Sequence, residues 1–107
     1  MSPARKADRD LDALIEEITV DAYDESEQLQ GFANAFDEDA NFPCSGTVIG
    51  EEVEVLSVSV GDHRRELIAT CKHSGRRYDV ALLDIDLRAD PATSRLMAAY
   101  RRWMGNF

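Results

Sequence analysis

The carboxylates are the side chains of this sequence whose types and spacing could do chemistry. Asp37, Glu38 and Asp39 fall where a predicted helix ends, and Asn41 follows them closely. The C-terminal end of a helix carries the negative pole of the dipole and carbonyl oxygens without a helical partner. Carboxylates there repel the dipole, and a bound cation would reverse that repulsion. Because carboxylate, carbonyl and amide oxygens are the ligands that Ca²⁺ prefers, this turn is a candidate calcium site; a charged, solvated helix end is the alternative.

A second group of carboxylates lies at the end of the last predicted strand. Asp84 and Asp86 are two residues apart, and side chains at that spacing point to the same face of a strand. Such a pair needs a positive charge nearby. Either Arg88 supplies that charge, or a bound cation does, in which case the pair shares the first site or forms a second one.

Asp21 and Asp24 are the next candidate ligands, provided that the connector before the second helix folds back toward the sheet. For Asp24 the alternative is structural. An Asp at this position caps the helix, and Glu27, three residues later, completes an acidic variant of the capping box.

Other kinds of chemistry find little support. The sequence contains no EF-hand loop, no G-x-S-x-G nucleophile motif and no phosphate-binding glycine loop. Cys44 and Cys71 stand alone, and with His63 and His73 they do not form the closely spaced pairs typical of zinc sites. We therefore expect reduced, mostly buried thiols, surface histidines in turns, and no enzyme activity.

Charge is the outlying property of the 107-residue chain, whose net charge is -9. Residues 10–62 hold 15 acidic residues and no Lys or Arg, whereas residues 63–107 hold nine basic and five acidic residues. This balance argues against nucleic acid and anionic membranes as partners. Either the basic half docks against the acidic half, or the acidic surface has a cationic partner; a generic solubilising surface is the remaining interpretation. With no apolar span and no export signal, a cytoplasmic location is expected.

Apolar spacing predicts the elements that position these residues. The chain is expected to form a single domain, 1–107, with a frayed start over residues 1–7. Apolar residues recur with helical spacing over residues 11–18, 29–36 and 96–104. Asp90 followed by Pro91 marks the start of the last helix.

The middle of the chain has the two-residue period of strands. Strands are predicted over residues 47–49, 52–60, 67–71 and 78–85, with turns at 61–63 and 74–75. The buried phase shifts near Leu56, which predicts a bulge or sharp bend there. The predicted fold class is α+β: two N-terminal helices, a small bent antiparallel sheet that could curl into an SH3-like partial barrel, and a C-terminal helix.

Several segments resemble the CcbP-type family of calcium-binding proteins, first described for cyanobacteria. They are VDAYDESEQ (20–28), NFP (41–43), VIGEEV (48–53), LLD (82–84) and AYRRW (99–103), in the family's order and spacing. The likeness spans about residues 18–103. It implies a small acidic cytoplasmic protein that binds Ca²⁺ without an EF-hand and buffers or sequesters it. It assigns no individual ligands.

Together these observations predict a protein that buffers Ca²⁺ through surface carboxylates. The alternative, from another class, is an acidic interaction module that docks on a basic protein partner. Clustered surface aromatics would favour that module, but Phe32, Phe36, Tyr100 and Trp103 lie on core-type stripes. In order of preference, the candidate calcium ligands are Asp37, Glu38 and Asp39, then Asp84 and Asp86, then Asp21 and Asp24.

Overall fold

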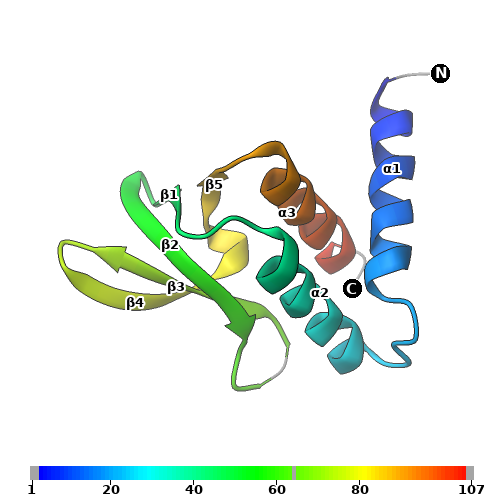
Figure 1. Ribbon diagram of the computed structural model, residues 1–107, viewed down its shortest axis with the longest axis horizontal. Coiled ribbons are helices and arrows are strands. Elements are labelled where there is room, and N and C mark those ends of the chain that lie inside the picture. The colour runs from blue at the N-terminus through cyan, green and yellow to red at the C-terminus, as the bar shows by residue number, and fades with distance from the viewer. Residues whose placement is uncertain (1–2, 64, 106–107) are drawn as a thin grey trace.

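The computed structural model describes residues 3–63 and 65–105. Along the chain the elements are α1 (Pro3–Ile18), α2 (Glu25–Asp39), β1 (Cys44–Val48), β2 (Glu51–Val60), β3 (Leu67–His73), β4 (Arg76–Ala81), the 3-10 helix η1 (Leu82–Asp84), β5 (Asp86–Arg88) and α3 (Pro91–Met104). Helices α2 and α3 lie against one face of the sheet, and α1 packs on the helices on the side away from the strands (Figure 1). The architecture is α+β, as predicted.

Helix α1 begins at Pro3. Proline suits the first turn of a helix because the N–H that it lacks would have no helical partner there. Met1 and Ser2 lie outside the described residues. The predicted apolar stripe of α1 packs against the core; its members are Leu11, Leu14, Ile15 and Ile18.

Both predicted helix caps are confirmed. The Glu27 N–H donates to Asp24 Oδ1 at 2.8 Å, and the Glu27 carboxylate accepts the Tyr23 N–H at 3.0 Å. At the start of α3, the Thr93 hydroxyl donates to Asp90 Oδ1 at 2.6 Å and accepts the Asn41 N–H at 3.1 Å. This second cap therefore also ties the end of α2 to the beginning of α3.

The core lies between α2, α3 and the inner face of the sheet. Phe32 and Phe36 of α2 contact Tyr100 of α3 edge to face, and Phe32 also packs on Trp103. All four aromatic side chains are buried. They are core residues, as their spacing predicted, and none contributes to an aromatic surface patch.

The sheet has the strand order β4-β3-β2-β1-β5 and stays open, with β4 and β5 at its edges in the described part of the chain. The register between β2 and β3 shifts between Val55 and Ser57, which confirms the bulge predicted near Leu56. A bulge bends and twists its strand. The sheet nevertheless does not close into a barrel, since β4 and β5 do not pair with each other in the described part of the chain.

The strand predicted over residues 78–85 is wrong in its extent. Strand β4 ends at Ala81, η1 follows, and the short strand β5 pairs with β1. Leu82 and Ile85 are fully buried, so their apolar character reflects a turn that packs on the core. Three residues are too few to show a two-residue period, so β5 has no sequence signal. Strand β1 likewise begins at Cys44 instead of Thr47.

The two cysteines lie on the inner face of the sheet. Register places Cys44 and Cys71 on either side of Val55, on three neighbouring strands. Both thiols are free, as expected. Burial raises the pKa of each thiol, which lowers the fraction of reactive thiolate.

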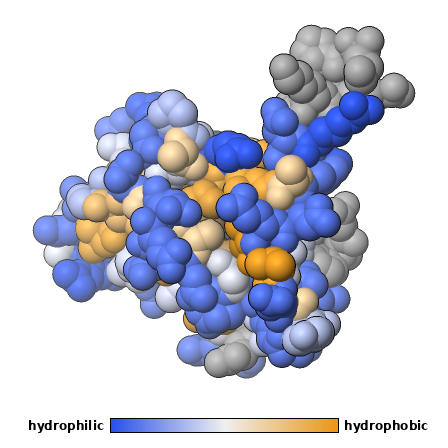
Figure 2. All heavy atoms as spheres, turned by 45° about the vertical axis from the view of Figure 1, so that its right-hand side comes forward, coloured by the Kyte–Doolittle hydropathy of each residue, from blue (hydrophilic) through white to orange (hydrophobic). Residues whose placement is uncertain are grey.

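Hydrophilic residues cover most of the face shown in Figure 2, with apolar side chains visible between them near the centre. Ion pairs join the basic segment (63–107) to the acidic segment (10–62): Arg102 contacts Asp12, and Arg88 contacts Glu52. The basic segment therefore contacts the acidic segment at some of its charged residues. In the described part of the chain, no helix is long and apolar enough to cross a membrane.

Candidate functional site

The three consecutive carboxylates at the end of α2 do not line one hollow. Asp37 faces the end of β2, whereas Glu38 and Asp39 line a separate hollow beside α1 and α3. Successive residues of an α-helix point about 100° apart, so consecutive side chains diverge. The structure thus separates Asp37 from its two neighbours.

A groove between α2 and the end of β2 combines Asp37 with a carboxylate that the sequence analysis did not select. We call it the α2–β2 groove; its volume is about 500 Å³. That carboxylate is Asp62, in the turn after β2, which lines the same groove as Asp37. The Gln30 amide nitrogen donates to Asn34 Oδ1 at 3.0 Å, which leaves the Gln30 amide oxygen available as a ligand. The groove is lined by Gln30, Ala33, Asn34, Asp37, Val58, Ser59, Val60, Gly61 and Asp62.

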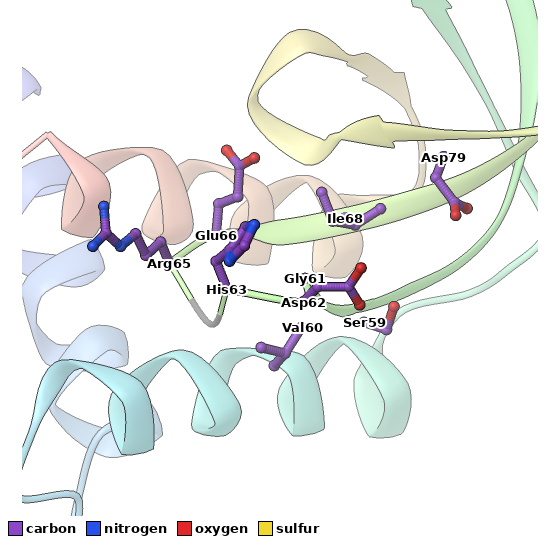
Figure 3. Close-up of a pocket in the computed structure, with 9 residues that line it drawn as sticks. All are labelled: Ser59, Val60, Gly61, Asp62, His63, Arg65, Glu66, Ile68 and Asp79. Carbon is purple, nitrogen blue, oxygen red and sulfur yellow. The ribbon is translucent and has the colours of Figure 1, made fainter.

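Asp62 also borders a second hollow, of about 590 Å³, on the side of β3 and β4 (Figure 3). Ser59 and Asp79 line this hollow as well, and Asp79 Oδ1 accepts the Thr70 hydroxyl at 3.0 Å. Asp62 is therefore shared by two hollows. Its sequence signal was only that of a turn residue, because the packing of β2 on α2 that forms the groove joins distant parts of the chain.

Glu38 and Asp39 line a hollow of about 260 Å³ together with Glu17 of α1. Helix α1 approaches α2 very closely here. A Cβ atom on Gly31 would lie 2.7 Å from the carbonyl oxygen of Ile18. The hollow is thus bounded by a tight contact between the two helices, with carboxylates from both at its rim.

Asp84 and Asp86 do not form the predicted pair on one strand, since Asp84 belongs to η1 and Asp86 to β5. Their expected partner, Arg88, contacts Glu52 instead, at 3.2 Å. The positive charge comes from Arg101 of α3, whose guanidinium lies 3.9 Å from Asp86. Arg101 also donates to the carbonyl oxygens of Leu83 and Ile85, at 2.9 and 2.7 Å. The guanidinium of Arg101 therefore already supplies the positive charge next to Asp86.

Asp21 and Asp24 lie in the connector between α1 and α2. Asp24 caps α2, which is the structural interpretation of this residue. Asp21 is exposed and has a positive φ of 64° in the turn after α1. The connector lies at the end of the helices remote from the strands (Figure 1), so these residues do not join Asp84 and Asp86.

Taken over residues 3–63 and 65–105, the candidate ligands are dispersed. No three His, Cys, Asp or Glu side chains come together there as a metal-binding group. His63 is exposed in its predicted turn, whereas His73 ends β3 and its Nδ1 lies 3.0 Å from the carbonyl oxygen of Glu52. The arrangement offers pairs of carboxylates accompanied by neutral oxygens, and one such pair, Asp37 and Asp62, lines the α2–β2 groove.

Comparison with known proteins places this geometry in context. A family model named for CcbP and described as calcium binding matches residues 12–104. The crystal structure of Anabaena CcbP is similar with a TM-score of 0.79 and 25% identity, over 90% of this chain and 89% of that one. A calcium-binding protein in its calcium-binding form is similar with a TM-score of 0.80 and 25% identity, over 99% and 97%. No match was found among curated proteins.

Proposed function

The chain belongs to the CcbP family of calcium-binding proteins, and from this premise we propose that it buffers or sequesters Ca²⁺ through surface carboxylates. The observation that carries the proposal is the α2–β2 groove, whose lining includes both Asp37 and Asp62. The groove is also lined by Gln30, whose amide oxygen is a neutral ligand. These are hard oxygen ligands of the kind that Ca²⁺ takes.

The α2–β2 groove is favoured over the other carboxylates because its described lining contains no basic side chain. Neither Lys nor Arg is among the described residues that line this groove. By contrast, Asp86 lies near Arg101, Glu52 contacts Arg88, and Asp24 is engaged as a helix cap. We propose that four other carboxylates bind the ion more weakly: Asp21, Glu38, Asp39 and Asp84.

The composition of the groove suits buffering. Ca²⁺ takes about six to eight oxygen ligands, so water must complete a shell built on two carboxylates and neutral oxygens. Calcium affinity rises with the number of charged ligands and with the rigidity of the site. A site with two carboxylates on an open surface therefore binds and releases the ion readily, and the net charge of -9 attracts cations to it.

Thermal unfolding of chelator-treated protein tests the proposal. A ligand that binds only the folded state raises the free energy of unfolding by about 2.7 kcal/mol when its concentration is a hundred times Kd. We expect Ca²⁺ to raise the melting temperature by several degrees more than equal Mg²⁺, and Asp37→Asn or Asp62→Asn to remove most of that rise. Glu54→Gln is the matched control, because Glu54 is exposed on β2 and lies outside the groove. A melting temperature that neither ion changes would exclude calcium binding. A rise in melting temperature as large in both Asp variants as in wild type would exclude this groove as the site.

A second candidate function, docking on a basic protein, is favoured by one observation. Tyr23 and Val20, in the connector after α1, are 90% and 67% exposed. The neighbouring residues in the sequence are acidic: Asp21, Asp24 and Glu25. An exposed aromatic side chain therefore lies within an acidic segment. Two results together would favour this function over buffering. The protein would show no thermal shift with Ca²⁺, and it would bind a basic protein in a way that Tyr23→Ser abolishes.

A further inference from the structure

Strand β4 presents an open edge of the sheet. It lies at one end of the strand order and pairs with β3 alone in the described part of the chain. Figure 1 shows it at the rim of the sheet, away from the helices. The residues from Arg76 to Asp79 are all exposed. The outward N–H and C=O groups of such a strand are available to pair with another extended chain.

The charge on this edge is opposite to that of the protein. Arg88, Arg101 and Arg102 contact carboxylates of their own chain, but neither Arg76 nor Arg77 has a carboxylate within 4.0 Å among the described residues. The two arginines form a cationic pair on a chain of net charge -9.

The register makes this placement costly for the fold. Arg77 lies opposite Lys72 in the register of β3 and β4. Like charges directly opposite each other on neighbouring strands are destabilising. Arg77 therefore gains nothing from its neighbour across the hairpin, and an incoming carboxylate would relieve its repulsion with Lys72.

The alternation of the strand defines what would fit. Arg76 and Tyr78 point to one face of the sheet, and Arg77 and Asp79 point to the other. Tyr78 is 47% exposed and offers an aromatic surface next to Arg76. A strand added to β4 would thus place carboxylates on both faces beside the arginines and an apolar side chain beside the tyrosine.

We propose that the edge of β4 is a docking site for an acidic, extended peptide segment of another protein, which adds to the sheet as a sixth strand. A nucleic acid fits less well, because a long polyanion would pass over a protein of net charge -9. A second copy fits less well too, because pairing β4 with itself would bring four arginines onto one ribbon. The inference is independent of the calcium site.

Fluorescence anisotropy with a defined probe tests this inference. The probe is a labelled peptide of about ten residues with blocked ends, long enough to span one strand. Pairs of Glu alternate with pairs of Val or Thr in it, so each face of the added strand carries both carboxylates and apolar side chains. Wild-type protein is expected to bind it, and Arg76→Gln with Arg77→Gln to weaken binding about tenfold. The matched control is Arg65→Gln with Arg95→Gln, which removes the same charge from two other exposed arginines. Circular dichroism checks that both double variants are folded.

A second probe separates strand addition from general charge attraction. The same peptide with alternate backbone nitrogens methylated keeps its charge but loses its ladder hydrogen bonds, so its binding should fall about tenfold or more. The proposal is overturned if wild type does not bind at about 1 mM, if both double variants lose affinity equally, or if methylation has no effect. Tighter binding of an oligonucleotide, or a dimer that the Arg76–Arg77 variant dissociates, would also overturn it in favour of those partners.

Discussion

Arg102 of α3 holds Asp12 of α1 through two hydrogen bonds, from Nε to Oδ1 at 2.7 Å and from Nη2 to Oδ2 at 3.1 Å. Asp8, one turn earlier in α1, lies 3.6 Å from the same guanidinium. This bidentate pair fastens the acidic first helix to the basic last helix. The apolar residues of α1 are only partly buried, so the pair contributes to keeping α1 in place.

Acid is expected to loosen α1. The hydrogen bond from Arg102 lowers the pKa of Asp12 below its ordinary value of 3.8. The stabilisation is therefore complete above that ordinary value and is lost as the pH falls through the lowered pKa. Hydrogen exchange of the α1 amides, corrected for intrinsic rates, should rise in that acid range. Arg102→Leu should raise exchange already at neutral pH and remove the acid dependence, whereas Arg95→Leu should leave both unchanged.

Replacing Ile49 by Asn is expected to stabilise the protein by about 1 kcal/mol. Val48 pairs with Glu51, so Ile49 and Gly50 form a two-residue hairpin turn, and both have positive φ, of 49° and 78°. A β-branched residue is strained there, and Asn-Gly is the preferred pair for this turn. Ile49 is 97% exposed, so its replacement removes no core contact.

Urea unfolding measures the Ile49→Asn effect, with Ser74→Asn at the equivalent turn as the comparison. Ser74 has a φ of 50° but is not β-branched, so its gain should be smaller. A lower midpoint for Ile49→Asn would show that the isoleucine contributes to the fold.

Gly31→Ala is expected to destabilise the protein by about 1–3 kcal/mol. In an exposed helix this change usually stabilises by up to about 1 kcal/mol. The sign reverses here because the new Cβ would lie 2.7 Å from the Ile18 carbonyl oxygen, where α1 meets α2. Thermal unfolding of Gly31→Ala beside Gln30→Ala, on an exposed position of the same helix, decides the sign; a gain in stability for Gly31→Ala would contradict the close approach of the helices.

Tyr100→Phe is expected to cost about 1–3 kcal/mol, because it leaves a buried N–H without a partner. The Tyr100 hydroxyl accepts the Leu67 N–H at 2.9 Å, and both side chains are fully buried. Tyr78→Phe is the control, since Tyr78 is 47% exposed and should change stability little. Chemical denaturation compares the two variants, and equal midpoints would show that water or another group satisfies Leu67.

Much of the fold could be predicted because the signals are local. Helical spacing placed the core aromatics, and Asp24 and Asp90 cap α2 and α3 as their sequence neighbours indicated. The phase shift near Leu56 gave the bulge. Strand β5 could not be predicted, because three residues carry no period and its pairing with β1 joins distant parts of the chain.

The candidate site was only partly predictable, for the same reason. Sequence alone determined which residues are acidic, that the negative charge is concentrated in residues 10–62, and that the chain resembles a calcium-binding family. It could not show that Asp37 lines one groove with Asp62, whereas Glu38 lines another hollow. Nor could it show that Arg101 is the cation near Asp86. Caps and periods depend on residues a few positions apart, whereas these relationships exist only once packing of the core has brought distant segments together.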